Sequence, residues 1–253
     1  IGFILNPYAG IGGKAGLKGS DNYKKIEKLL LEGCERTASK RAESCMSKIA
    51  DLTASLVAGD KGLVGEKNFS ILSAPGDMGE ALLEKLKIPC DVVLCPKADT
   101  SSAEDTKLCA QIMKEQGVDL LVFCGGDGTA RDICEAVGTD VTVLGIPAGV
   151  KMYSACYACN PYQAGEMLAG WLEGKEMSYE MREVLDIEEK DLDSRNISPQ
   201  LYGFLEVLSD GKHLQKAKEL DLGSGESATI IARAAILRME KDWVYIIGPG
   251  GTT

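Results

Sequence analysis

The stretch DLLVFCGGDGTARD (residues 119–132) decides the fold, because an apolar run ends abruptly at two glycines. The run at 119–124 is continuously apolar after its first residue, which is typical of a parallel strand covered on both faces. The segment at 130–137 is predicted to be a helix. A buried strand, a glycine-rich turn and a helix form the repeating unit of a doubly wound α/β sheet.

Strands and helices alternate on both sides of this unit. Apolar runs predict further strands at 2–5, 69–74, 90–96 and 141–146, and helical segments are expected at 22–56, 77–86, 101–117 and 161–174. This alternation predicts an α/β fold with a doubly wound parallel sheet over residues 1–175. Strand-like runs dominate after that point, so we expect residues 176–253 to form a β-rich second domain that is incomplete at its C-terminal end.

The composition indicates a globular protein that avoids polyanions. The 253 residues are 45% hydrophobic and 26% charged, and the formal net charge is −10. Such a body repels a nucleic-acid backbone or an anionic membrane surface, and no apolar run has the length of a membrane-spanning helix. We therefore expect no nucleic-acid or membrane partner, and an anionic substrate would need a local positive site.

Cysteine and histidine usage limits the possible chemistry. Nine scattered cysteines, an odd number, fit a reducing cytoplasm and packing roles better than a disulfide framework. Cys156 and Cys159 form one CxxC pair, which could bind a metal or act in redox chemistry, or could pack on one face of a helix. The single histidine, His213, leaves no basis for histidine-rich zinc sites or a Ser-His-Asp triad, and we expect it in a solvated loop or helix.

The first glycine-rich corner directly follows the buried strand at 119–124. Gly125 and Gly126 allow a ligand to approach the backbone closely, and the next helix points its N–H groups at the corner, which suits a phosphate. Asp127 is unusual there because a carboxylate repels phosphate. It could act as a base toward a hydroxyl or hold a magnesium ion, or it could simply cap the helix.

Two further corners also follow predicted strands. In NPYAGIGGKAG (6–16), Asn6 and Pro7 make a turn, the glycines offer backbone donors and Lys14 adds positive charge. In GIPAGVKMYSACYACNP (145–161), Gly149 shapes a turn and Lys151 is expected at the start of a helix. A lysine is electrostatically unfavourable at that position unless a phosphate lies nearby, although it could also reach solvent.

These motifs resemble a known superfamily. GGDGT after a strand, together with NPYAG near the start, is similar to the NAD kinases and diacylglycerol-type lipid kinases. Lipid kinases usually carry a Gly-Thr-Gly-Asn-Asp segment at the third corner, where this chain has Gly-Val-Lys-Met (149–152). With NPYAGIGGKAGLKGSD, SAEDT and IGPGGTT, the whole chain resembles the AcoX-like branch, ATP- or polyphosphate-dependent NAD kinase-like proteins that include those named for acetoin catabolism.

The resemblance implies a Rossmann-like N-terminal domain, a β-rich C-terminal domain and a site between them. It implies that Asp127 activates the 2′-hydroxyl of the adenosine ribose of NAD, giving NADP, with Mg²⁺ accompanying ATP or polyphosphate as the donor. We also expect a homo-oligomer, in the cytoplasm that the cysteine usage favours. No side chain is assigned as a metal ligand. The residues expected at nucleotide or phosphate groups are Asn6, Gly10, Gly12, Gly13, Lys14, Gly125, Gly126, Gly128, Thr129, Gly149, Lys151, Gly250, Thr252 and Thr253.

The chain also departs from the family pattern. The Asn-Glu pair with which typical NAD kinases hold the nicotinamide nucleotide is not found, and the Gly-Ser-Thr loop has its counterpart only at 248–253. The acceptor could therefore be another nucleotide or a small hydroxylated metabolite. A lipid kinase and a nucleotide-binding regulator without turnover remain the alternative functions.

Overall fold

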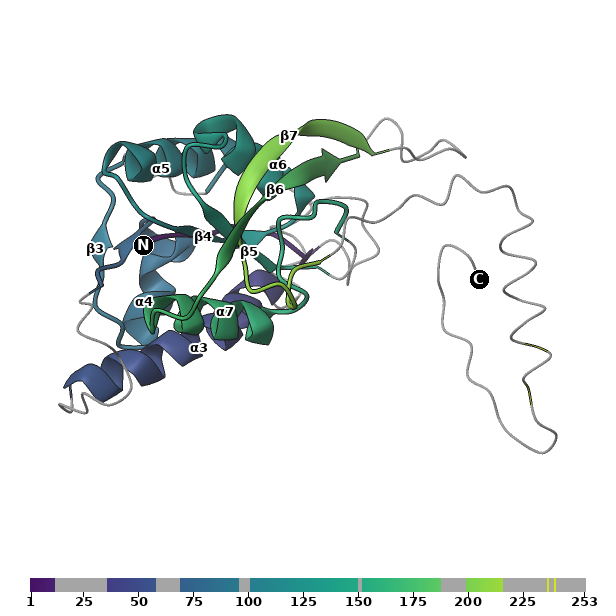
Figure 1. Cartoon of the computed structure of the whole chain (residues 1–253). Coiled ribbons are helices and arrows are strands. Elements are labelled where there is room, and N and C mark those ends of the chain that lie inside the picture. The colour runs from purple at the N-terminus through teal and green to yellow at the C-terminus, as the bar shows by residue number, and fades with distance from the viewer. Residues whose placement is uncertain are drawn as a thin grey trace. The chain divides into compact units, whose positions relative to one another are not determined.

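The computed structural model describes residues 1–11, 36–57, 69–95, 101–149, 152–187 and 199–215, together with Ile236 and Met239. The chain divides into two compact units, 1–218 and 219–253. All helices and strands described below belong to the first unit (Figure 1).

The described part of the first unit is built on one seven-stranded sheet with the order β3-β2-β1-β4-β5-β7-β6. All neighbouring pairs are parallel except β6 and β7, which are antiparallel. The strands are β1 (Gly2–Leu5), β2 (Leu72–Ser73), β3 (Asp91–Val92), β4 (Leu121–Gly125), β5 (Val143–Pro147), β6 (Ser178–Asp186) and β7 (Gln200–Ser209). The predicted doubly wound α/β fold is thus confirmed, and β4 is buried along its whole length as its apolar run predicts.

Helices cover both faces of this sheet (Figure 1). They are α3 (Thr37–Val57), α4 (Glu80–Lys85), α5 (Ala103–Glu115), α6 (Asp127–Val137) and α7 (Pro161–Leu172), with a 3₁₀ turn at Gly76–Met78. Val122 and Leu144 belong to the core beneath α3 and α7, whereas Phe123 and Val143 belong to the core beneath α5 and α6. Within the described ranges, no helix combines the length and apolar character needed to cross a membrane.

The strand-rich segment expected after residue 175 begins with β6 and β7. Val207 of β7 pairs in parallel with Val143 of β5, and β6 pairs along the outer side of β7. Both strands therefore extend the sheet that the earlier strands begin. The assignment of residues 176–253 to a separate β-rich domain stays a prediction.

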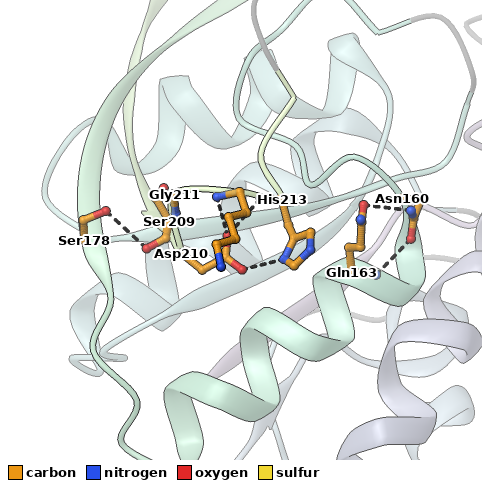
Figure 2. Close-up of polar contacts among 8 residues, drawn as sticks. Asn160, Gln163, Ser178, Ser209, Asp210, Gly211 and His213 are labelled. Carbon is orange, nitrogen blue, oxygen red and sulfur yellow. Dashed lines mark hydrogen bonds and ion pairs between the residues drawn. The ribbon is translucent and has the colours of Figure 1, made fainter.

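A polar turn after β7 fixes the one histidine (Figure 2). Asp210 Oδ1 accepts hydrogen bonds from the backbone N–H groups of Lys212 and His213, and Asp210 Oδ2 lies 2.5 Å from His213 Nδ1. The carbonyl oxygen of His213 accepts a 2.7 Å hydrogen bond from the N–H of Cys159, next to the start of α7. His213 thus lies in a loop, as expected, but its ring is half-buried and held by Asp210 rather than freely solvated.

The pKa of Asp210 responds to these contacts. Burial favours the neutral carboxyl, but the N–H groups of Lys212 and His213 and the His213 ring favour the carboxylate, and the net pKa is lowered. A lowered carboxyl pKa contributes stability above the unfolded-state value, about 3.9, and this contribution is lost as the pH falls through the folded-state value.

We therefore predict that Asp210→Asn lowers the free energy of unfolding by about 1 kcal/mol at pH 7. The difference between wild type and variant should shrink as the pH falls below about 4, because the wild-type carboxyl then becomes protonated and resembles the amide. Urea unfolding of both proteins between pH 7 and pH 3 measures this. A difference that stays constant over the whole range would contradict the assigned role.

Candidate active site

The strand order places the switch point of the sheet between β1 and β4, where open α/β sheets typically form a crevice. From β1 the sheet continues through β2 to β3, whereas from β4 it continues through β5 in the other direction. The loops that leave β1 and β4 therefore diverge to opposite faces, and ligands of open α/β sheets bind in such a crevice at the carboxyl ends of the strands. The first corner and the described part of the second, residues 6–11, lie there.

A side-chain hydrogen bond joins these two corners. Asn6 Nδ2 donates to Thr129 Oγ1 at 2.9 Å, and Asn6 Oδ1 accepts from the N–H of Tyr8 at 3.1 Å. Thr129 is buried and its hydroxyl also accepts from the N–H of Gly126 at 3.4 Å. Both predicted residues are brought to the crevice, and the contacts of Thr129 hold the turn together. A contact of Thr129 with phosphate stays a prediction.

Gly10 is required for the contact between the second and third corners. Its φ is +78°, and a Cβ at this position would lie 2.4 Å from the carbonyl oxygen of Ala148. Gly126 differs, because no heavy atom of the described residues lies within 4 Å of where its Cβ would stand. The described backbone leaves space at Gly126, whereas a Cβ on Gly125 would lie 2.4 Å from Thr129, so Gly125 allows close packing of that side chain. Contact of either glycine with phosphate stays a prediction.

Asp127 connects the first corner with the third. It is the first residue of α6, and the N-cap is Gly126. Asp127 Oδ2 accepts a 2.9 Å hydrogen bond from the N–H of Tyr153, and Oδ1 accepts a 2.8 Å bond from the N–H of Ser154. These bonds go to a distant segment and not to the N–H groups of its own helix, so they are not a helix cap.

Ser154 and Tyr157 fix the segment that holds Asp127. The buried Ser154 hydroxyl donates to the carbonyl oxygen of Leu185 at 2.8 Å and accepts from its N–H at 3.1 Å. Tyr157 donates its hydroxyl to the carbonyl oxygen of Gly126 at 2.6 Å, and burial raises the pKa of this phenol well above its ordinary value, which keeps it a donor. Neither side chain is predicted from the sequence, although both lie in the third glycine-rich stretch.

Two arginines that sequence analysis missed also reach the site. Arg41 of α3 donates to the carbonyl oxygens of Pro147 and Gly149, at 3.1 and 3.2 Å. Arg131 of α6 forms a 3.0 Å ion pair with Asp186 at the end of β6. Arg41 is distant in sequence from the glycine-rich corners, and Arg131 follows the first corner but pairs with a residue 55 positions later. Neither contact has a local signal, because both exist only once the helices have packed on the sheet.

Of the remaining predicted residues, two are described. Gly149 lies at the third corner. A Cβ added to Gly128 would lie 3.8 Å from Asp186 Oδ2. The others lie outside the described residues, so their predicted roles stay predictions: Gly12, Gly13, Lys14, Lys151, Gly250, Thr252 and Thr253.

The third corner differs from its predicted local structure. A helix was expected to begin at Lys151, but residues 152–160 are not helical, and α7 begins at Pro161 with Asn160 as its N-cap. The backbone before α7 bonds elsewhere: the N–H groups of Tyr153 and Ser154 bind Asp127, and the Ala155 N–H binds the Glu183 carbonyl. N–H groups bound in this way are not available for the backbone hydrogen bonds of a helix.

The CxxC pair is equally unlike the expected helical face. Cys156 is buried and Cys159 is exposed, and both lie in the non-helical segment before α7. Among the described residues there is also no group of three or more histidine, cysteine, aspartate or glutamate side chains that could hold a metal ion. Cys156 thus packs in the core, whereas Cys159 does not share a buried face with it.

A parallel sheet with glycine-rich corners at its switch point is the architecture of a nucleotide-binding α/β protein. Residues 1–176 match the family model described as the ATP-NAD kinase N-terminal domain, and the chain belongs to this family. Comparison with curated proteins gave no match, and comparison with solved structures gave none either. The predicted kinship with NAD kinases is confirmed, and the phosphoryl transfer typical of kinases is the chemistry of the family. Membership of the AcoX-like branch stays a prediction.

The Gly10 contact yields a stability prediction. Gly10→Ala should lower the free energy of unfolding by roughly 3 kcal/mol, because a left-handed backbone and a clash with a carbonyl oxygen add together. Gly117→Ala is the matched control: its φ is +72°, but nothing lies within 4 Å of its Cβ position. It should cost about 1–2 kcal/mol. Equal losses for both variants in urea unfolding would show that the contact with Ala148 is not rigid.

Proposed function

We propose that the protein transfers a phosphoryl group from ATP or polyphosphate to the 2′-hydroxyl of the adenosine ribose of NAD, giving NADP. The observation that carries the proposal is the position of Asp127. Its carboxylate is fixed by two backbone N–H groups at a glycine-rich corner of the switch-point crevice. Membership of the ATP-NAD kinase family supports the same chemistry.

The corner offers favourable contacts to phosphate. The 11-residue helix α6 begins directly after Gly126, and the positive end of its dipole faces the crevice. The open backbone at Gly126 lets phosphate oxygens approach closely. On a chain with a formal charge of −10, such a local site is needed to attract an anionic donor. Lys14 and Lys151 are proposed to add the cationic side chains.

Asp127 is proposed to take the proton from the acceptor hydroxyl. A carboxylate weakens phosphate binding by repulsion, so its presence at this corner supports a role in the reaction. In phosphoryl transfer, a protein must align donor and hydroxyl, neutralise charge and remove a proton. The hydrogen bonds from Tyr153 and Ser154 hold the carboxylate in one orientation, which serves alignment.

Mg²⁺ is proposed to enter with the donor. The phosphates of the donor are proposed to supply most of its ligands, as is common for Mg²⁺. Bound there, it would neutralise charge on the transferred group. We assign no side chain as its ligand.

The direct test is an assay for NADP. The full chain is incubated with Mg²⁺, with ATP or polyphosphate, and with NAD or other hydroxylated acceptors. NADP formation supports the proposal. Phosphorylation of diacylglycerol in vesicles but not of NAD would favour a lipid kinase, and thermal stabilisation by nucleotide without turnover would favour a regulator.

Asp127→Asn tests the proposed base. The amide keeps the shape and one hydrogen-bond acceptor but loses the negative charge, so kcat should fall about 10²–10⁴-fold while nucleotide binding persists or tightens. Asp140→Asn is the control, because Asp140 is exposed, pairs with Lys114 and lies before β5, at the opposite end of the strands. Its kcat should match the wild type. Near-normal turnover of a folded Asp127→Asn protein would rule out Asp127 as the base.

A further inference from the structure

Two cysteine thiols touch on the face of the sheet away from α3 and α7. Cys95 follows β3, and Cys109 lies in α5. Their sulfur atoms are 3.6 Å apart, and both cysteines are free thiols. In Figure 1, β3 lies at the edge of the sheet and α5 packs over the same end of it. Because the two positions come from different elements, only the folded chain brings these thiols together.

We propose that Cys95 and Cys109 are an oxidative modification site, where a low-molecular-weight disulfide such as oxidised glutathione converts the two thiols into one intramolecular disulfide. A disulfide has a sulfur–sulfur distance of about 2.05 Å, so closing the bond requires a shift of about 1.5 Å. The two sulfurs are already in direct contact, and no other atom has to leave the space between them.

Cys95 is the side that can move. It follows β3, an edge strand of only two residues, and the preceding Leu94 is 94% exposed. Its N–H donates to the nearby carbonyl oxygen of Val93. Cys109, in contrast, is fully buried inside the 13-residue helix α5, which packs against α6. The end of β3 can therefore approach α5 without disturbing the helix.

The two thiols differ in access, and this sets the order of the reaction. Cys95 is partly exposed and can meet a solute, whereas Cys109 is buried, and burial raises the pKa of its thiol. Redox-sensitive cysteines typically combine an accessible thiol with a neighbouring resolving thiol. Cys95 is the accessible member of this pair and Cys109 the resolving one.

The chemistry balances as two thiol–disulfide exchanges. The Cys95 thiolate attacks one sulfur of oxidised glutathione, the glutathione disulfide bond breaks, and one glutathione leaves as a thiolate. Cys109 then loses its proton to solvent and attacks the Cys95 sulfur, and the second glutathione leaves. Two protein thiols are oxidised, and one glutathione disulfide is reduced to two thiols.

The test is oxidation of the full chain with oxidised glutathione, followed by intact mass measurement and peptide mapping. The wild type should form a species lighter by two hydrogens, in which Cys95 is joined to Cys109, and dithiothreitol should reverse it. Cys109→Ala should instead retain one glutathione on Cys95, and in Cys95→Ser the buried Cys109 should stay a thiol. Circular dichroism confirms that each variant is folded.

Cys90→Ser is the matched control, because Cys90 is also partly exposed and lies just before β3. It should still form the Cys95–Cys109 bond. The proposal is overturned if wild-type Cys95 keeps its glutathione while Cys109 remains a thiol, or if either cysteine pairs with a different one. These readouts do not involve catalysis, so they stand independently of the proposed kinase activity.

Discussion

The bonds between the Asp127 carboxylate and the N–H groups of Tyr153 and Ser154 organise the candidate site. They connect the start of α6 with a segment between β5 and α7, and thereby fix the side of the crevice at β4 and β5. Hydrogen bonds from backbone N–H groups to a charged carboxylate are stronger than hydrogen bonds between neutral groups, and two of them fix its orientation. The same bonds place the carboxylate where a base would be needed and keep the segment after β5 from forming a helix.

The strands beyond residue 175 hold the segment that binds Asp127. Ser154 is held by the backbone of Leu185 in β6, and Ala155 by the carbonyl oxygen of Glu183 in the same strand. Strand pairing joins β6 to the sheet through β7. The position of Asp127 therefore depends on the strand-rich part of the chain as well as on the early parallel strands that the family match covers. Residues 1–176 alone would lack the contacts of Ser154 and Ala155 with β6.

The site also reconciles an acidic protein with an anionic ligand. A formal charge of −10 gives no long-range attraction to phosphate, so binding must come from short-range donors. The start of α6 and the open backbone at Gly126 are such donors, and they carry no net charge that would need a counter-ion. Arg41 binds carbonyl oxygens of the third corner and Arg131 pairs with Asp186, so both stabilise the protein around the site.

The sequence by itself determined the α/β class, the buried strand at 119–124 and the glycine-rich corners, because these depend on local patterns of apolar residues and glycines. It also indicated the kinase family through GGDGT. Only the tertiary structure decided that Asn6 binds Thr129, that Asp127 binds a segment 26 residues away, and that Cys95 touches Cys109. Such contacts follow from how helices pack on the sheet and from the order of its strands. The same reason explains why residues 152–160 are not helical. Local propensity was overridden by backbone bonds to Asp127 and β6, which no short stretch of sequence encodes.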